Sequence, residues 1–230
     1  MKKKLKQPSL TIIIYARMNS KRLPNKVLMK VGSQVLLKLI VDRINTQTKN
    51  KYPIIVATSK KQLDNQIVTF CKKNKIEVFR GDLNDVFKRT VQCIDKYSIK
   101  NFVRVCADRP FFDVRLMERM INKFKKNKFD IITNQLIKTY PKGLACEISS
   151  TKIFKDINQN TLNPKEKEHV FNYFYKNHKK YQIYNFKLNS LKDMKKINYS
   201  INTKKELIEI SKIFNKYKNK KYIDILKLAK

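Results

Sequence analysis

The sequence predicts an α/β protein built on a single doubly wound, mostly parallel sheet with helices on both faces. Two observations support this prediction. Short apolar runs rich in β-branched residues alternate with longer segments in which apolar residues recur at helical spacing. Polar or charged residues follow these runs directly, as expected where buried strands end. The chain of 230 residues contains no repeat or linker-like segment, so we expect one domain over residues 1–230, with residues 1–9 flexible.

The first half of the chain shows this alternation most clearly. Residues 10–16 (LTIIIYA) and 53–59 (PIIVATS) are short β-branched runs, which predict buried strands. Between them, residues 34–45 carry apolar side chains at helical spacing and predict an amphipathic helix. The same reasoning predicts strands at 76–79 and 102–107 and helices at 62–74, 84–97 and 114–126.

The second half of the chain is less regular. Residues 140–150 show no clear period. The remaining patterns predict strands at 130–133, 182–188 and 197–201 and helices at 166–176 and 204–217.

The formal net charge is +35, which raises the question of a nucleic-acid or membrane partner. The lysines are spread along the whole chain together with many Asn and Ile, a mixture typical of compositional bias in the source. There is no aromatic RNA-binding strand pattern and no GXXG loop, so nucleic acid is not the expected primary partner. No apolar run is long enough to span a membrane, and we expect a cytoplasmic protein with buried, unligated cysteines.

Arginine is used sparingly in this lysine-rich chain, and none follows Arg119. A retained guanidinium suggests a need for its planar fork, which lysine cannot supply. Two arginines stand in the loop 17–26, directly after the first predicted strand, with two lysines, Ser20 and no acid. Such a loop suits anionic oxygens, because parallel sheets bind ligands beyond the carboxyl ends of their strands. Composition alone leaves an ordinary solvated loop equally open.

The order of residues in this loop resembles a known signature. The pattern A-R-x-x-S-x-R-L-P-x-K-x-L from Ala16 is similar to the opening of the cytidylyltransferases that activate acidic sugars, of the spore-coat polysaccharide and acylneuraminate type. Five further segments match in order: Ala57-Thr58-Ser59, R-G-x-x-x-D-V-x-x-R from Arg80, V-R-x-x-A-D-x-P from Val103, Pro141-x-Gly143-Leu144 with Glu147, and Glu168-His169-Val170.

The resemblance implies a fold of the nucleotide-diphospho-sugar transferase type and a defined reaction. Such an enzyme transfers CMP from CTP to a keto-deoxy or nonulosonic sugar acid, with Mg²⁺ as cofactor, and releases pyrophosphate. The implied nucleotide-binding residues are Ala16, Arg17, Ser20, Arg22, Lys26, Thr58, Ser59, Arg80 and Asp108. Among these, the resemblance assigns catalysis to Arg17, Lys26 and Asp108. The sequence does not decide the oligomeric state, and a homodimer remains open.

The resemblance implies an acceptor-side region within residues 135–200. The implied acceptor and metal residues each have a structural alternative. Glu147 would contact the sugar, but it could equally be an ordinary acid on a strand surface. His169 would also contact the sugar, although a structural or capping role fits as well. Asp108 would hold Mg²⁺, whereas beside arginines it could form a structural ion pair.

The chain departs from the family pattern at three places. Ala145 stands where the family has an aspartate, and Asn202 replaces another aspartate associated with the metal. Asn202 keeps an oxygen ligand but loses the charge, which predicts weaker Mg²⁺ binding. Arg109 replaces an uncharged residue beside Asp108. These departures leave three alternatives open: a nucleotide-binding paralogue without turnover, a different acceptor, or a different nucleotide.

Overall fold

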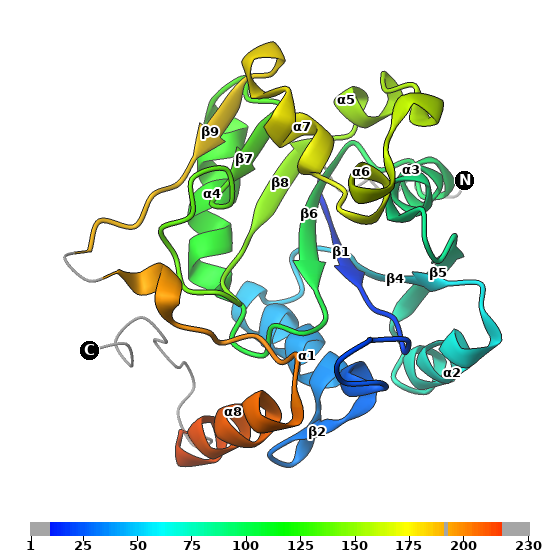
Figure 1. The fold of residues 1–230 in the computed structure, drawn as a ribbon, viewed down its shortest axis with the longest axis vertical. Helices are drawn as coiled ribbons and strands as arrows, with labels where there is room; N and C mark the ends of the chain where they lie inside the picture. Colours follow the sequence, from blue (N-terminus) through cyan, green and yellow to red (C-terminus); the bar gives the residue numbers. More distant parts are fainter. Residues whose placement is uncertain (1–9, 191–192, 218–230) are drawn as a thin grey trace, which may run out of the picture.

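The computed structural model describes residues 10–190 and 193–217. The flexibility expected for residues 1–9 concerns residues outside this range. The central sheet has seven strands in the spatial order β5-β4-β1-β6-β8-β7-β9 (Figure 1). The bounds of these strands are β1 Thr11–Tyr15, β4 Ile54–Ser59, β5 Glu77–Gly81, β6 Asn101–Cys106, β7 Ile131–Thr133, β8 Glu147–Ser150 and β9 Ile183–Asn185.

The sheet is mostly parallel, as predicted. Strands β5, β4, β1 and β6 run in the same direction, β8 is antiparallel to both β6 and β7, and β9 is parallel to β7. The chain builds the sheet outward from β1 through β4 to β5 and then returns to place β6 on the other side of β1. The strand order therefore reverses between β1 and β6, which is where sheets of this kind bind ligands.

Helices cover both faces of the sheet, as predicted (Figure 1). Helices α1, α2, α4 and α8 pack on one face through apolar residues that include Ile12, Ile14 and Val105. Helices α3 and α5 and the segment containing α6 and α7 pack on the other face, against Ile13 and Phe102. The helix bounds are α1 Leu36–Thr48, α2 Asn65–Lys73, α3 Val86–Lys96, α4 Val114–Lys126, α5 Lys152–Lys155, α6 Pro164–Glu168, α7 Asn172–Lys176 and α8 Lys204–Lys216.

Local capping explains why two predicted helices begin where they do. The Asp85 side chain accepts a hydrogen bond from the Lys88 amide and caps α3. Asp113 likewise accepts from the Leu116 amide and caps α4, whose bounds equal the predicted range. Each bond satisfies an amide that the first helical turn leaves without a partner.

Two predicted elements in the second half differ from the structure. The helix expected at 166–176 is two short helices, because His169 has an extended backbone between α6 and α7. This break lets Val170 and Phe171 enter the apolar layer beside the sheet. The strand expected at 197–201 is absent from the named strands of the described chain, where Asn198 makes one isolated bridge with Lys142.

The bridge between Lys142 and Asn198 requires a glycine beside it. Gly143 has φ +94°, and a Cβ there would lie 2.6 Å from the carbonyl carbon of Tyr199. Only glycine tolerates both the conformation and the approach. This contact brings the segment before α8 toward the end of β6, where the Ile201 amide donates to the Asp108 carbonyl at 2.9 Å.

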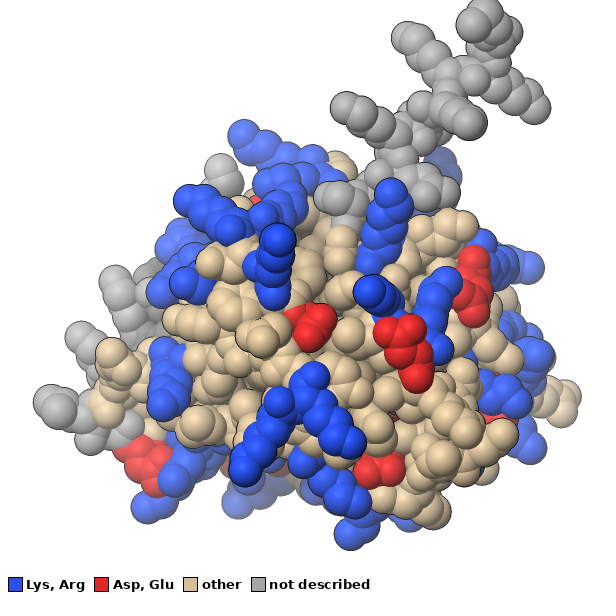
Figure 2. Space-filling model, turned by 90° about the horizontal axis from the view of Figure 1, so that it is seen from above, with Lys and Arg blue, Asp and Glu red and all other residues tan. Residues whose placement is uncertain are grey.

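A short hairpin, β2 (Lys30–Val31) and β3 (Gln34–Val35), leads into α1 and lies against α8. Within the described residues, no helix combines the length and apolarity needed to cross a membrane. Basic side chains are scattered over the face shown in Figure 2, with few acids among them, consistent with a diffuse surplus of charge.

Candidate functional site

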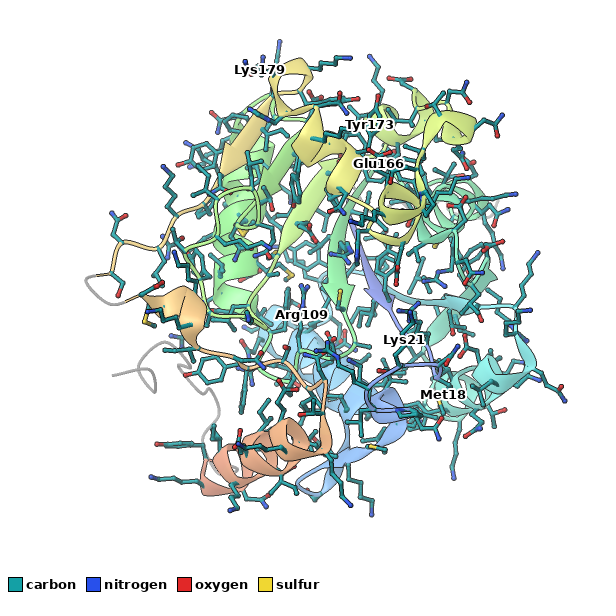
Figure 3. The ribbon with its side chains drawn as sticks, in the orientation of Figure 1. Met18, Lys21, Arg109, Glu166, Tyr173 and Lys179 are labelled. Carbon is teal, nitrogen blue, oxygen red and sulfur yellow. The ribbon has the colours of Figure 1, made fainter. Side chains whose placement is uncertain are left out.

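A cavity of about 410 Å³ lies beyond the carboxyl ends of β1 and β6, at the reversal of strand order. The loop after β1 forms one wall with five residues predicted for the site: Ala16, Arg17, Ser20, Arg22 and Lys26. Three more predicted residues, Asp108, His169 and Asn202, reach the cavity from distant segments. Figure 3 shows Lys21 in the loop after β1 and Arg109 after β6, both beyond the ends of these strands.

Buried side chains of the loop after β1 fix it to the core. Met18 and Leu23 are 1% and 8% exposed and anchor the loop in the core. The Met18 amide donates to the buried carboxylate of Asp64 at 2.8 Å, and the Met18 carbonyl accepts from the Ser20 and Asn25 amides. This anchoring leaves the polar side chains of the loop at the cavity.

The Lys26 ammonium lies at the centre of a polar group at the end of β6. Its Nζ atom donates to Asp108 Oδ2 at 3.0 Å, to the Ile201 carbonyl at 2.8 Å and to Asn202 Oδ1 at 3.2 Å. These three acceptors match the three protons of an ammonium group. The Lys26 side chain is 12% exposed, and its contacts restrict its position.

This arrangement bears on the expected Mg²⁺ site. Asp108 and Asn202 lie together, as a shared metal would require, but Lys26 Nζ lies between them and contacts both. No group of three or more His, Cys, Asp or Glu side chains suited to a metal occurs among the described residues. One carboxylate, one amide and a neighbouring ammonium do not fit a Mg²⁺ site formed by the protein alone, because Mg²⁺ prefers several oxygen ligands.

Arg109 lies beside Asp108 and reaches the segment before β8. Its Nη1 atom donates to the Ala145 carbonyl at 2.6 Å, and its Nε atom is 3.9 Å from Asp108 Oδ1. The guanidinium therefore joins the end of β6 to the segment before β8. Two departures from the family pattern, at 109 and 145, are thus in contact with each other.

The wall opposite the loop is formed by the end of α6. Arg17 Nη2 pairs with Glu168 Oε1 at 3.1 Å, which joins the loop after β1 to this helix. Both side chains are partly exposed, at 39% and 47%, so the pair can open without the cost of burying a charge. His169 follows as the C-cap of α6, and its amide donates to the Lys165 carbonyl while the residue also lines the cavity.

Glu147 neither lies on a strand surface nor lines the cavity as a sugar contact would. It is 2% exposed, and it pairs with the guanidinium of Arg104 while accepting a hydrogen bond from the Tyr175 hydroxyl at 2.6 Å. Burial raises the pKa of Glu147, but Arg104 and Tyr175 outweigh it and the net direction is downward. Glu147 does not line the cavity, whereas its partner Arg104 does. Glu147 is thus placed to hold Arg104 rather than to contact a ligand.

Three residues predicted near the nucleotide base do not line the cavity: Thr58, Ser59 and Arg80. Thr58 and Ser59 are fully buried at the end of β4, and Ser59 donates to Asp64. Arg80 donates to the Ser59 carbonyl and to the Lys61 carbonyl, both at 3.0 Å. Ser59 thus supports the loop after β1 through Asp64, which accepts from the Met18 amide, and Arg80 holds the backbone at Ser59.

The cavity also contains residues that sequence reasoning did not assign to the site: Tyr15, Lys21, Arg89, Arg104 and Glu168. The scarcity of arginine in this chain could have indicated Arg89 and Arg104. Tyr15 gave no such signal, since it appears in the sequence as one apolar residue within a buried strand.

Comparisons with known proteins give the relatives of this chain. A family model described as cytidylyltransferase matches residues 11–229. An uncharacterised protein of Methanocaldococcus jannaschii is 34% identical over 72% of this chain and 66% of its own length. The spore coat polysaccharide biosynthesis protein SpsF of Bacillus subtilis is 32% identical over 74% of this chain and 70% of its own. A 3-deoxy-manno-octulosonate cytidylyltransferase of Wigglesworthia glossinidia brevipalpis is 26% identical over 64% of this chain and 60% of its own length.

Solved structures show the same fold. A cytidylyltransferase of Leptospira borgpetersenii superposes with a TM-score of 0.80 at 24% identity, covering 91% of this chain and 95% of its own. A CMP:2-keto-3-deoxy-manno-octonic acid synthetase complexed with CTP superposes with a TM-score of 0.67 at 13% identity, covering 90% and 98%. At these identities the structures establish the fold, and the sequence relatives carry the further comparison.

Proposed function

Because the chain belongs to the cytidylyltransferase family, we propose that it transfers CMP from CTP to an acidic sugar used for a surface polysaccharide. As a member of this family it is a nucleotidyltransferase enzyme. Acidic sugars and a coat polysaccharide appear in the names of its relatives, which supports this choice of acceptor. We expect the reaction in the cytoplasm, where nucleoside triphosphates are supplied.

One observation carries the proposal: an acid-free basic loop lines the cavity at the reversal of strand order. Two acidic side chains, Asp108 and Glu168, line the same cavity, and both are paired with cations. Lys21 and Arg22 form no ion pair within the described part of the chain. Their charges are therefore available to the phosphates of CTP.

The proposed reaction is an in-line displacement at the α-phosphate. The sugar hydroxyl forms the new O–P bond and loses its proton to water, the bond to the β-phosphate oxygen breaks, and pyrophosphate leaves. The protein contributes mainly by positioning both substrates and by stabilising charge on the phosphates. Lys26, fixed by three acceptors, is placed to meet this charge, and the cationic loop to hold the leaving pyrophosphate.

Mg²⁺ fits this proposal as part of the nucleotide substrate. Within the described residues, Asp108 is the one carboxylate that Lys26 contacts, so the remaining oxygens would have to come from CTP. We propose that the ion enters as its CTP complex.

The first test is nucleotide binding. CTP at a hundredfold excess over its Kd should stabilise the fold by about 2.7 kcal/mol, measured as a thermal shift, and more than ATP, GTP or UTP do. Pyrophosphate release should then occur with CTP and one of a panel of keto-sugar acids, and assays with and without Mg²⁺ test the metal. Equal shifts with all four nucleotides would contradict cytidine selectivity, and no shift with any would contradict the proposed function.

A second test separates specific phosphate contact from the diffuse positive charge. Arg22→Lys keeps the charge but loses the guanidinium fork, so the Kd for CTP should rise about tenfold if Arg22 binds phosphate in a bidentate manner. Arg119→Lys is the matched control, since Arg119 is exposed on α4 and does not line the cavity. Calorimetric titration measures both. Equal small changes in the two variants would mean that the loop acts only through its general charge.

A further inference from the structure

Arg89 is a buried cation at the cavity, and one of its N–H groups has no hydrogen-bond partner. It extends from α3, is 2% exposed and lines the cavity. Its Nη1 atom donates to the Asp82 carbonyl at 3.0 Å, and its Nε atom is buried with no hydrogen-bond partner. Within residues 10–190 and 193–217, no carboxylate forms a salt bridge with it. Burial accordingly lowers the pKa of Arg89. An unpaired buried charge is costly, which points to an anion that binds there.

The stem of Arg89 is fixed by its surroundings. The side chain lies across Gly81 so closely that a Cβ there would be 2.5 Å from Arg89 Cγ. Arg89 stands in the first turn of α3 after the Asp85 cap, and its guanidinium carbon is 6.0 Å from the centre of the Tyr15 ring. The guanidinium is therefore held in position before any ligand arrives.

Arg104 approaches the same tyrosine from β6. Its guanidinium carbon is 5.6 Å from the centre of the Tyr15 ring, and its Nε atom is also buried without a partner. Unlike Arg89, it is paired with a carboxylate, that of Glu147, which Tyr175 also contacts. The two guanidinium groups thus lie near one aromatic ring, and each keeps a buried Nε–H group without a hydrogen-bond partner.

We propose that Arg89 and Arg104 form the subsite for the carboxylate of the acceptor sugar. This inference rests on the proposed function. Two guanidinium groups with unpartnered N–H donors suit one planar carboxylate, whereas the triphosphate has Lys21 and Arg22 of the loop, which form no ion pair within the described residues. The neighbouring residues agree with this assignment. Glu147 and Tyr175 hold Arg104, and Glu168 and His169 line the same cavity. These four neighbours lie within the region 135–200 expected to bind the acceptor.

The subsite gives a reason for acceptor selectivity. A neutral sugar would leave Arg89 buried and unpaired, while an acidic sugar would supply the missing charge and acceptors for the free N–H groups. Selection for the acidic group would then come from the cost of the unpaired arginine as well as from the new contact.

The test uses Arg89→Gln, with Arg119→Gln as the matched control. The acid titrated is 3-deoxy-manno-octulosonate, added by calorimetry to protein saturated with CDP, which has no pyrophosphate to release. Arg89→Gln should weaken binding of the acid roughly tenfold to a hundredfold, while the Kd for CTP changes less than about threefold. Arg119→Gln should change neither. Arg89→Lys keeps the stem and charge, and it should give an intermediate loss if Arg89→Gln does not fold.

The outcomes separate this inference from the proposed function. If either Arg89 variant weakens CTP as much as it weakens the acid, Arg89 serves the triphosphate and the inference is wrong. Unchanged acid binding in both variants, or no acid binding by the parent protein, would also overturn the inference. The proposed function would stand in each case if CTP stabilises the protein and pyrophosphate is released. If neither occurs, the proposed function fails first.

Discussion

Replacing Glu147 by glutamine should destabilise the fold by about 3–5 kcal/mol, because it removes one partner of a buried ion pair. The carboxylate of Glu147 accepts from the Arg104 guanidinium through one oxygen and from the Tyr175 hydroxyl through the other. A glutamine amide has a single acceptor oxygen, so its NH₂ group would face one of these donors. Urea denaturation of both proteins at pH 7 measures the loss.

The pH dependence of this loss has a definite sign. The folded pKa of Glu147 lies below its ordinary value of 4.5, so its ionised form stabilises the fold fully above pH 4.5. The stabilisation is lost as pH falls through the lower, folded pKa. The difference in unfolding free energy between the parent protein and Glu147→Gln should therefore shrink as pH falls below 4.5.

Glu118→Gln is the control for this prediction. Glu118 pairs with Lys51 at 3.8 Å on the surface, where the side chains are 38% and 54% exposed, and such pairs contribute about 0–1 kcal/mol. A loss at Glu147 no larger than the loss at Glu118 would mean that Arg104 and Tyr175 find water or other partners without it.

Replacing Lys26 by methionine should lower kcat by roughly a hundredfold to a thousandfold with little loss of stability. Under the proposed function, the ammonium stabilises charge on the phosphates in the transition state. Three acceptors hold it in place before CTP arrives, so little reorganisation is needed during the reaction. Its removal leaves Asp108 without this partner, but the Asp108 side chain is 24% exposed and water can solvate it. Steady-state pyrophosphate release and a thermal melt measure the two effects.

Lys216→Met provides the matched control, because Lys216 is exposed on α8 and lies outside the cavity. Lys26→Arg adds a second variant that retains the charge, although a planar guanidinium cannot reproduce the three contacts of the ammonium. A kcat within about threefold of the parent value in both Lys26 variants would contradict a catalytic role. A large fall in melting temperature for both, with kcat preserved at low temperature, would make the contacts of Lys26 structural.

Much of the fold could be predicted because its signals are local. The alternation of apolar runs and helical spacing identified β1, β4, β5 and β6 and the helices between them, but not the hairpin of β2 and β3, where residues 34–35 were predicted as the start of a helix. Asp113 caps α4 within its own first turn, so that helix began and ended where the sequence indicated. Prediction failed at 166–176 and 197–201, where packing overrides local pattern. His169 interrupts the helix so that Phe171 reaches the core, and the bridge at Asn198 depends on Gly143.

For the candidate site, the sequence likewise indicated the residues of the loop after β1 but not the orientation of every side chain. The sequence order of the loop after β1 indicated which residues would stand at a ligand cavity, and eight predicted residues do line it. The orientation of side chains was not available from the motifs. Ser59 belongs to a matching segment, yet it is fully buried and bonded to Asp64, because residues of a motif can hold a loop as well as contact a ligand.

By itself, the sequence determined the doubly wound α/β fold, the family and the basic character of the loop after β1, since these depend on residues near one another in the chain. Only the tertiary structure decided which charges meet. Lys26 contacts Ile201 and Asn202, 175 and 176 residues away, and Glu147 pairs with Arg104, 43 residues away. The physical reason is that the energy of an ion pair depends on distance and burial in space, which packing of the whole chain sets. That packing leaves Arg89 as the buried cation without a carboxylate partner in the described chain.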